Sequence, residues 1–183
     1  HFAANEDAAT RLLKTGEQSE RIFNVGAPQL DEFANGHVTS VQSLQKMYNF
    51  DFKQKYILIL QHSVTEEHIH AGDQMRITLE AIKKLSIPSI LISPNSDAGT
   101  TSVQQVIEEF SNPLLKVHRN IKREDYAGFL SSASVIVGNS SSGLLEAPSF
   151  SLPCVNIGRR QHGRMQGQNV INCEHDIDKI MQS

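Results

Sequence analysis

Three short runs of apolar residues, each about the length of one strand, constrain the fold of this chain more than any other feature. They are Tyr56–Leu60, Pro88–Ser93 and Ala133–Val137. Each run is apolar at consecutive positions instead of alternate ones, which is typical of strands that are buried on both faces of a parallel sheet. The pattern therefore predicts a sheet that is covered by other elements on both sides.

Segments with helical periodicity separate these strands, and the connections are only a few residues long. This alternation is typical of right-handed βαβ crossovers. We therefore expect an α/β protein with a Rossmann-like parallel sheet and helices on both faces, and we treat residues 1–183 as a single domain. The expected helices are Asn5–Thr15, Val38–Met47, Thr65–Leu85, Ser102–Phe110, Arg123–Ser132, Ser141–Phe150 and Asp176–Met181. The further strands are Arg21–Val25, Leu114–His118 and Leu152–Ile157.

Composition excludes several classes of protein. The chain has 17 Lys and Arg against 20 Asp and Glu, 6% aromatic residues and no Trp, which argues against a nucleic-acid surface. Its two cysteines, Cys154 and Cys173, lack the spacing of a zinc site or a disulfide scaffold and indicate a reducing, cytoplasmic setting. No apolar run approaches the roughly 18 residues of a membrane span, and because His1 and the residues after it lack the basic-then-apolar pattern of a signal peptide, we expect none. Because the first residue is His1 and not Met, we expect the chain to start partway through a larger polypeptide.

Ligands of open parallel sheets bind beyond the carboxyl ends of the strands, so the loops that follow the predicted strands are the candidate site. Four such loops carry polar or charged residues, and all should lie on one rim of the sheet. They are Gln61–Thr65, Pro94–Asp97, Gly138–Gly143 and Gly158–Arg160.

The loop Gly138–Gly143 is the most informative of the four. Its small residues and hydroxyls, followed by a predicted helix, can cradle a phosphate or diphosphate. It matches neither a Walker loop, nor a dinucleotide fingerprint, nor a nucleophile elbow, so ATP hydrolysis and NAD chemistry are not indicated. The alternative is that Ser and Gly only cap the helix. Glu146, in that helix, either accepts hydrogen bonds from a ribose diol or is an exposed, solvated carboxylate.

Two further loops offer cationic and titratable groups. Arg159 and Arg160 provide permanently charged donors for phosphate oxygens, or they are ordinary surface arginines. His62 directly follows a buried strand and either acts on the ligand as an acid or donor, or has a structural role. His68, His70 and His162 lack a third ligand at a matching spacing, so we expect no metal.

Several ordered blocks of this sequence form a pattern. They are His1–Asp7, Phe23–Asp31, Leu60–Thr65, Pro94–Gly99, Ile136–Ser141 with Glu146, and Pro153–Arg164. Together these blocks resemble a known family, the hydrolysing UDP-N-acetylglucosamine 2-epimerases of sialic-acid biosynthesis, and specifically their C-terminal half. The resemblance covers nearly the whole chain.

The resemblance implies a nucleotide-binding domain that forms the second half of a glycosyltransferase-B-type enzyme, with a UDP-sugar bound between two Rossmann-like domains. It implies that the first, N-terminal domain is absent from this chain, and that the full-length enzyme is a homo-oligomer without a cofactor. It also implies roles for individual residues, with His62 as the catalytic one. Ser140 and Ser141 would hold the diphosphate, Glu146 the ribose, Arg160 a phosphate or nearby uridine group, Asn95 would line the pocket, and His62 would contact the departing diphosphate.

The implied reaction is elimination of UDP to 2-acetamidoglucal, followed by addition of water to release N-acetylmannosamine. The acid and base carboxylates would come mainly from the first domain, so we expect this chain alone to bind without turnover. Three alternatives remain open: an epimerase acting on UDP-diacetylbacillosamine, the donor-binding half of a glycosyltransferase, and a stand-alone nucleotide-sugar-binding module.

Overall fold

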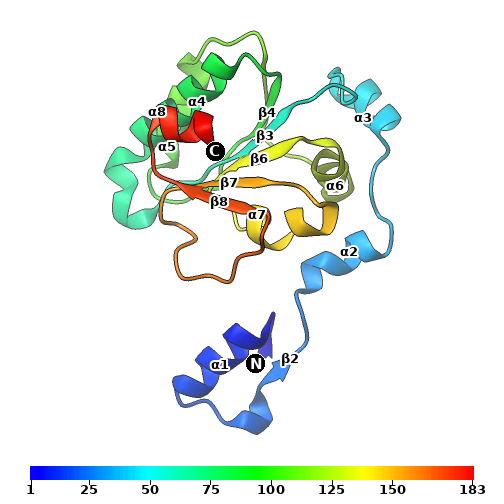
Figure 1. Ribbon diagram of the computed structural model, residues 1–183, viewed down its shortest axis with the longest axis vertical. Coiled ribbons are helices and arrows are strands. Elements are labelled where there is room, and N and C mark those ends of the chain that lie inside the picture. The colour runs from blue at the N-terminus through cyan, green and yellow to red at the C-terminus, as the bar shows by residue number, and fades with distance from the viewer. The chain divides into compact units, whose positions relative to one another are not determined.

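The computed structural model describes residues 1–183, and residues 38–183 contain a six-stranded, wholly parallel sheet (Figure 1). The strand order is β5-β4-β3-β6-β7-β8. This is the order of a doubly wound Rossmann sheet. Successive strands are added outward on one side of β3 and then, from β6 onward, on its other side, so the strand order reverses between β3 and β6. The predicted α/β, Rossmann-like class is confirmed. The strands are β3 (Ile57–Leu60), β4 (Ser89–Ile92), β5 (Leu115–His118), β6 (Val135–Gly138), β7 (Cys154–Ile157) and β8 (Val170–Cys173).

Helices cover both faces of this sheet (Figure 1). One face carries α4 (Ala71–Leu85), α5 (Thr100–Glu109) and α8 (Ile177–Gln182). The other carries α3 (Val41–Tyr48), α6 (Arg123–Ser132) and the short α7 (Ser142–Leu145). No helix is long and apolar enough to cross a bilayer.

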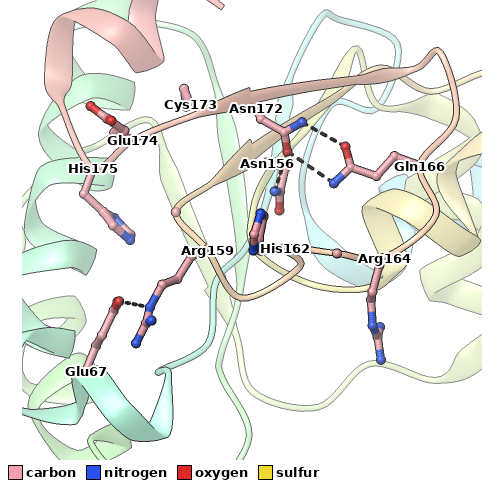
Figure 2. A pocket seen from close by; sticks show the side chains of 12 residues that line it. Glu67, Asn156, Arg159, His162, Arg164, Gln166, Asn172, Cys173, Glu174 and His175 are labelled. Atoms are coloured by element: carbon pink, nitrogen blue, oxygen red, sulfur yellow. Dashed lines mark hydrogen bonds and ion pairs between the residues drawn. The ribbon is translucent and has the colours of Figure 1, made fainter.

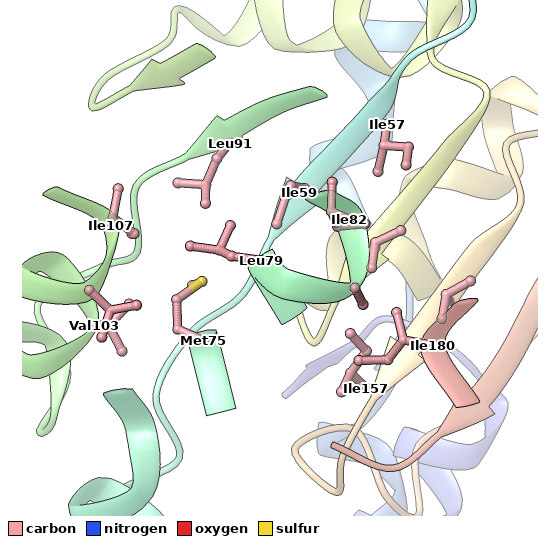
Figure 3. Packing of buried hydrophobic residues seen from close by; sticks show 14 of the residues in the cluster. Ile57, Ile59, Met75, Leu79, Ile82, Leu91, Val103, Ile107, Ile157 and Ile180 are labelled. Atoms are coloured by element: carbon pink, nitrogen blue, oxygen red, sulfur yellow. The ribbon is translucent and has the colours of Figure 1, made fainter. Parts of the chain in front are cut away.

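The main apolar core lies between the sheet and the face formed by α4, α5 and α8. Figure 3 shows Leu79 and Ile82 of α4 packed against strand residues such as Ile59, and all three are at most 1% exposed. Burying one such side chain contributes about 1.5 to 3 kcal/mol. The core therefore fixes the strand ends from which the loops of the candidate site leave.

The N-terminal residues form a second compact unit, His1–His37, separate from Val38–Ser183. In it, β1 (Phe2–Ala3) pairs in parallel with β2 (Phe23–Asn24). Its helices are α1 (Glu6–Lys14), α2 (Asp31–Ala34) and the 3-10 helices Ser19–Arg21 and Pro28–Leu30. The side chain of Asn5 caps α1 by accepting a hydrogen bond from Ala8 N at 2.8 Å. From the sequence we predicted a single domain over residues 1–183. In the structure the Rossmann-like sheet lies entirely in Val38–Ser183.

Two predicted helices are broken. Thr65–His70 is a 3-10 helix with non-helical torsions at Glu67, and only the rest of the predicted segment, Ala71–Leu85, is α-helical. The predicted helix Ser141–Phe150 divides into α7 and a 3-10 helix, Ala147–Phe150. Pro148 lies in the first turn of that 3-10 helix, where its missing N–H and its ring prevent α7 from continuing.

Two strands were not predicted. β1 is only two residues long, and β8 lies at the edge of the sheet with Ile171 half exposed. Neither therefore has the continuous apolar run that identifies a central strand.

The confinement of the sheet and its core to Val38–Ser183 predicts that residues 38–183 fold alone. Their urea midpoint should equal that of the sheet transition in the whole chain, measured by circular dichroism. Leu79→Ala is the control, since a core truncation should cost about 2 to 5 kcal/mol in either form. A clearly lower midpoint for residues 38–183 would show that His1–His37 stabilises the sheet.

Candidate functional site

The loops after β3 and β6 meet at the point where the strand order of the sheet reverses. β3 pairs with β4 on one side and with β6 on the other. In open α/β sheets the crevice at such a point, outside the carboxyl ends of the strands, is the usual place for a ligand. The structure therefore places the predicted loops Gln61–Thr65 and Gly138–Gly143 side by side at this crevice.

The side chain of Asn139 joins these two loops. It is fully buried, its Oδ1 accepts a hydrogen bond from His62 N at 2.7 Å, and its Nδ2 donates one to His62 O at 2.8 Å. The Asn139 carbonyl accepts further bonds from Gln161 Nε2 at 2.7 Å and Arg160 Nη1 at 3.2 Å. One residue thus ties together the loops that follow β3, β6 and β7.

Gly138 allows β3 and β6 to approach each other closely just before this junction. Its φ is +136°, and a Cβ atom there would lie 2.0 Å from the carbonyl oxygen of Leu60. That contact is with backbone and cannot relax through a side chain. Only glycine fits this position, which accounts for the first residue of the predicted phosphate-binding loop.

The imidazole of His62 has a defined tautomer. Its Nδ1 accepts a hydrogen bond from the backbone N–H of Asn95 at 3.3 Å, so the neutral ring carries its proton on Nε2. Burial lowers the pKa of His62, and the nearby charge of Arg160 lowers it further, while a hydrogen bond with the Asn95 side chain and the charge of Asp97 oppose the shift. His62 is therefore a neutral side chain near pH 7 with an Nε2–H donor.

Asn95 and Arg160 meet at Asp97. The side chain of Asn95 donates to Asp97 Oδ2 at 2.7 Å, and Arg160 Nη2 lies 3.9 Å from the same oxygen. His62, Asn95 and Arg160 were predicted from three separate loops, and the structure brings all three together. Asp97 and Asn139 connect them, and neither was predicted as a site residue.

Ser140 and Ser141 follow Asn139 and are partly buried at the start of α7. The hydroxyl of Ser140 accepts a hydrogen bond from Ser142 N at 3.3 Å. α7 is a single turn, so its dipole is much smaller than the sequence pattern suggested. Any anion binding by this loop must therefore depend on its hydroxyl and backbone donors.

Glu146 is buried, at 8% exposure, and does not fit the alternative of an exposed, solvated carboxylate. It lies between α7 and the following 3-10 helix. Its Oε1 is ion-paired with Arg123 Nη1 at 2.8 Å, and its Oε2 accepts a hydrogen bond from Ser142 Oγ at 2.6 Å. Neither partner was predicted, because no sequence pattern relates Arg123 to Glu146.

Two hollows lie on this rim. One, of about 440 Å³, is lined by residues that include Ser63, Thr65, Asp97 and Arg160. The other, of about 610 Å³, lies at the ends of β7 and β8 (Figure 2). Both hollows are lined by Arg159 and His162.

Figure 2 shows the polar residues of the larger hollow, of which the sequence analysis had named only Arg159 and His162. Arg159 is ion-paired with Glu67. Asn156 Nδ2 donates to Asn172 Oδ1 at 2.8 Å, and Gln166 pairs with the same amide. The larger hollow thus extends the rim toward the edge strand of the sheet.

A family model described as UDP-N-acetylglucosamine 2-epimerase matches residues 1–183. The chain belongs to this family. Among curated members it is 35% identical over 182 residues to UDP-N,N'-diacetylbacillosamine 2-epimerase (hydrolyzing) of Legionella pneumophila, covering 99% of this chain and 48% of the relative. It is 32% identical over 181 residues to UDP-N-acetylglucosamine 2-epimerase of Neisseria meningitidis serogroup B, with 98% and 48% coverage. The chain therefore spans about half the length of these epimerases.

Solved structures of epimerases share the fold. The S. aureus MnaA–UDP co-structure superposes with a TM-score of 0.71 at 20% identity, covering all of this chain and 50% of the other. UDP-GlcNAc 2-epimerase from Neisseria meningitidis bound to UDP-GlcNAc gives 0.70 at 17% identity, with 100% and 51% coverage. At these identities the likeness concerns the α/β fold, which is that of the glycosyltransferase-B-type epimerases.

The contribution of Arg160 to the electrostatics of His62 can be tested by titration. Arg160→Gln should raise the pKa of His62 toward 6.5, because it removes a positive charge that disfavours the imidazolium. NMR titration of the imidazole signals measures this. His175 is the control, since burial lowers its pKa without a contribution from Arg160. An unchanged pKa of His62 in Arg160→Gln would contradict the proximity of the two groups.

The lowered pKa of His62 also predicts a dependence of stability on pH. The folded state should lose stability as the pH falls below about 6.5, because the unfolded chain then binds a proton that folded His62 does not.

Proposed function

We propose that this chain is the UDP-sugar-binding half of a hydrolysing UDP-N-acetylglucosamine 2-epimerase. The observation that carries the proposal is the junction at Asn139, which brings an imidazole donor and a guanidinium together at the switch point of a Rossmann-like sheet. This is the place and the chemistry that a nucleoside diphosphate requires. Membership of the epimerase family supports the same assignment.

In this proposal the diphosphate lies over the loops after β3, β6 and β7. Arg160 supplies fixed positive charge, and the Nε2–H of His62 donates to a diphosphate oxygen. Ser140 and Ser141 supply donors to the same group, and Asn95 lines the pocket. Glu146 accepts from the ribose hydroxyls.

The proposed reaction begins with breakage of the bond between sugar C1 and the diphosphate oxygen, whose electron pair leaves with UDP. A base removes the proton from C2, which gives 2-acetamidoglucal, and water then adds to release N-acetylmannosamine. His62 and Arg160 meet the negative charge that develops on the leaving diphosphate. Such contacts accelerate a reaction because they are stronger in the transition state than in the ground state. The base and acid are assigned to the other half of the full-length protein.

The proposal includes a division between two domains. Val38–Ser183 is the second Rossmann-like domain, and His1–His37 packs into the sheet of the first. Supporting this, β1 and β2 are parallel strands, which normally have both faces covered, yet Phe2 is 80% and Phe23 53% exposed. Two strands of two residues each are also too few to form a stable sheet alone.

The proposal further includes a cytoplasmic, homo-oligomeric enzyme without a cofactor that acts in sialic-acid biosynthesis. Cys154 and Cys173 are not joined in a disulfide, which fits a reducing compartment.

UDP-diacetylbacillosamine is the second candidate substrate. It is favoured by the 35% identity to the Legionella pneumophila enzyme, whose name specifies that sugar. The two substrates differ at C4 and C6 of the sugar, and the diphosphate- and ribose-binding groups described above do not contact those positions.

Product analysis tests the reaction. The full-length protein should release UDP and free N-acetylmannosamine from UDP-N-acetylglucosamine, identified by NMR, with one deuterium at C2 when the reaction runs in D₂O. Release of the free epimerised sugar only from UDP-diacetylbacillosamine would establish the second candidate. Release of unepimerised sugar, or transfer without release of a free sugar, would contradict the epimerase assignment.

The role of His62 predicts a kinetic effect. In the full-length protein, His62→Ala should lower kcat by about 100-fold or more, about 2.7 kcal/mol, while changing the Kd for UDP much less. The reason is that the Nε2–H donor meets charge that grows as the C1–O bond breaks. Steady-state kinetics and isothermal titration measure the two quantities.

The matched control is His70→Ala, at an exposed histidine on the 3-10 helix before α4. It should leave kcat unchanged. A near-normal kcat with a lowered melting temperature in His62→Ala would assign His62 a structural role only.

A further inference from the structure

The carboxylate of Glu146 is held by two side chains from two helices, and a third side chain supports one of them. Arg123 is the first residue of α6 and is ion-paired with Oε1, and Ser142 is the first residue of α7 and bonds Oε2. Tyr126, one turn along α6 from Arg123, is hydrogen-bonded to Ser142 Oγ. Tyr126, Ser142 and Glu146 are each at most 8% exposed. Because a buried carboxylate is costly unless it is paired, this arrangement fixes where Glu146 can lie.

The direction of the hydrogen bonds follows from counting protons. A serine hydroxyl has one proton, and Ser142 donates it to Glu146 Oε2. Ser142 Oγ must therefore accept from Tyr126, so the chain of donors runs from Tyr126 to Ser142 to Glu146. Burial raises the pKa of Tyr126 far above neutrality, which keeps its phenol available as a donor.

These contacts occupy only part of the acceptor capacity of Glu146. An ionised carboxylate has about four lone-pair sites, two on each oxygen. Arg123 uses a site on Oε1 and Ser142 uses a site on Oε2. These two contacts account for two of the four sites, and the two adjacent carboxylate oxygens match the spacing of two vicinal hydroxyls.

We propose that Arg123, Tyr126 and Ser142 are positioning residues that hold the Glu146 carboxylate for a ribose cis-diol, so that the site selects ribonucleotides over 2'-deoxyribonucleotides. This rests on the proposed function, which places the ribose at Glu146. Because the partners hold both oxygens, the carboxylate cannot turn to make a single, better bond with a lone 3'-hydroxyl. Loss of the 2'-hydroxyl therefore leaves one oxygen without its ligand partner, and an unmade bond to a charged group is costly.

The readout is the ratio of the Kd for dUDP to the Kd for UDP, measured by isothermal titration on the full-length protein. This ratio reports on the 2'-hydroxyl alone, because both ligands carry the same base and diphosphate. In the wild-type protein it should be about tenfold or more, since a hydrogen bond to a charged group is worth roughly that factor. Glu146→Gln should bring it close to one.

Two variants test the positioning residues. Ser142→Ala removes the donor to Oε2, and Tyr126→Phe keeps the ring but removes the donor to Ser142. Both variants should lower the ratio at least about threefold, mostly by raising the Kd for UDP. Because the two changes lie on different helices, one variant suffices if the other fails to fold.

Tyr48→Phe is the matched control. Tyr48 also donates to a carboxylate on α6, Asp125, at 2.8 Å, but that carboxylate is not Glu146. The control should lose some stability and keep the wild-type ratio. A general loosening of α6 would instead lower the ratio in the control as well, and that result would overturn the positioning role.

The outcomes separate the inference from its premise. A wild-type ratio near one, or a ratio that Glu146→Gln leaves unchanged, would remove the ribose from Glu146 and overturn both. A high ratio that is lost in Glu146→Gln but kept in folded Ser142→Ala and Tyr126→Phe would leave the ribose contact intact and overturn only the positioning role. A ratio lowered in those two variants and kept in Tyr48→Phe would support the inference.

Discussion

The buried amide of Asn139 is the interaction on which the candidate site depends. Backbone pairing between β3 and β6 continues just past the strands, where Leu60 O accepts from Asn139 N, and the loops then separate. The Asn139 side chain extends the connection by bonding both backbone groups of His62. Only an amide can accept and donate in this way, since a carboxylate has no donor and a hydroxyl is too short to reach both groups. The place of the imidazole at the crevice follows from this one side chain.

The two faces of the sheet contribute different properties. The face covered by α4, α5 and α8 holds the main apolar cluster and supplies burial. The face covered by α6 also buries polar groups, because Asp125 accepts from Thr39 and Tyr48 while Arg123 reaches Glu146. Apolar contacts do not depend strongly on the orientation of the two groups, whereas hydrogen bonds in a buried network require a particular orientation. This difference explains how α6, which is only weakly amphipathic, can still have a fixed position and orientation on the sheet.

The electrostatics of the rim favour an anion without requiring a protonated histidine. Arg160 carries permanent charge, and the same charge lowers the pKa of His62. The neutral ring still presents an Nε2–H, because Nδ1 is occupied by the Asn95 backbone. Under the proposed function, a bound diphosphate is met by one cation and one neutral donor over a wide pH range, and the charge that develops on departure is shared between them.

The sequence was enough to predict the α/β class and the rim of the candidate site. Continuous apolar runs identify buried parallel strands, and the loops after them must share an edge, so the loops that carry His62, Asn95, Ser140 and Arg160 could be predicted to lie together. It could not give the break at Pro148 in a helical pattern, the edge strand β8, or the separate unit His1–His37. The three-dimensional arrangement was needed to see that Asn139 bridges two loops and that Arg123 and Ser142 hold a buried Glu146. The contacts of Asn139 with His62 and of Arg123 with Glu146 join residues far apart in the chain, and they depend on strand order and helix placement, which local periodicity does not encode.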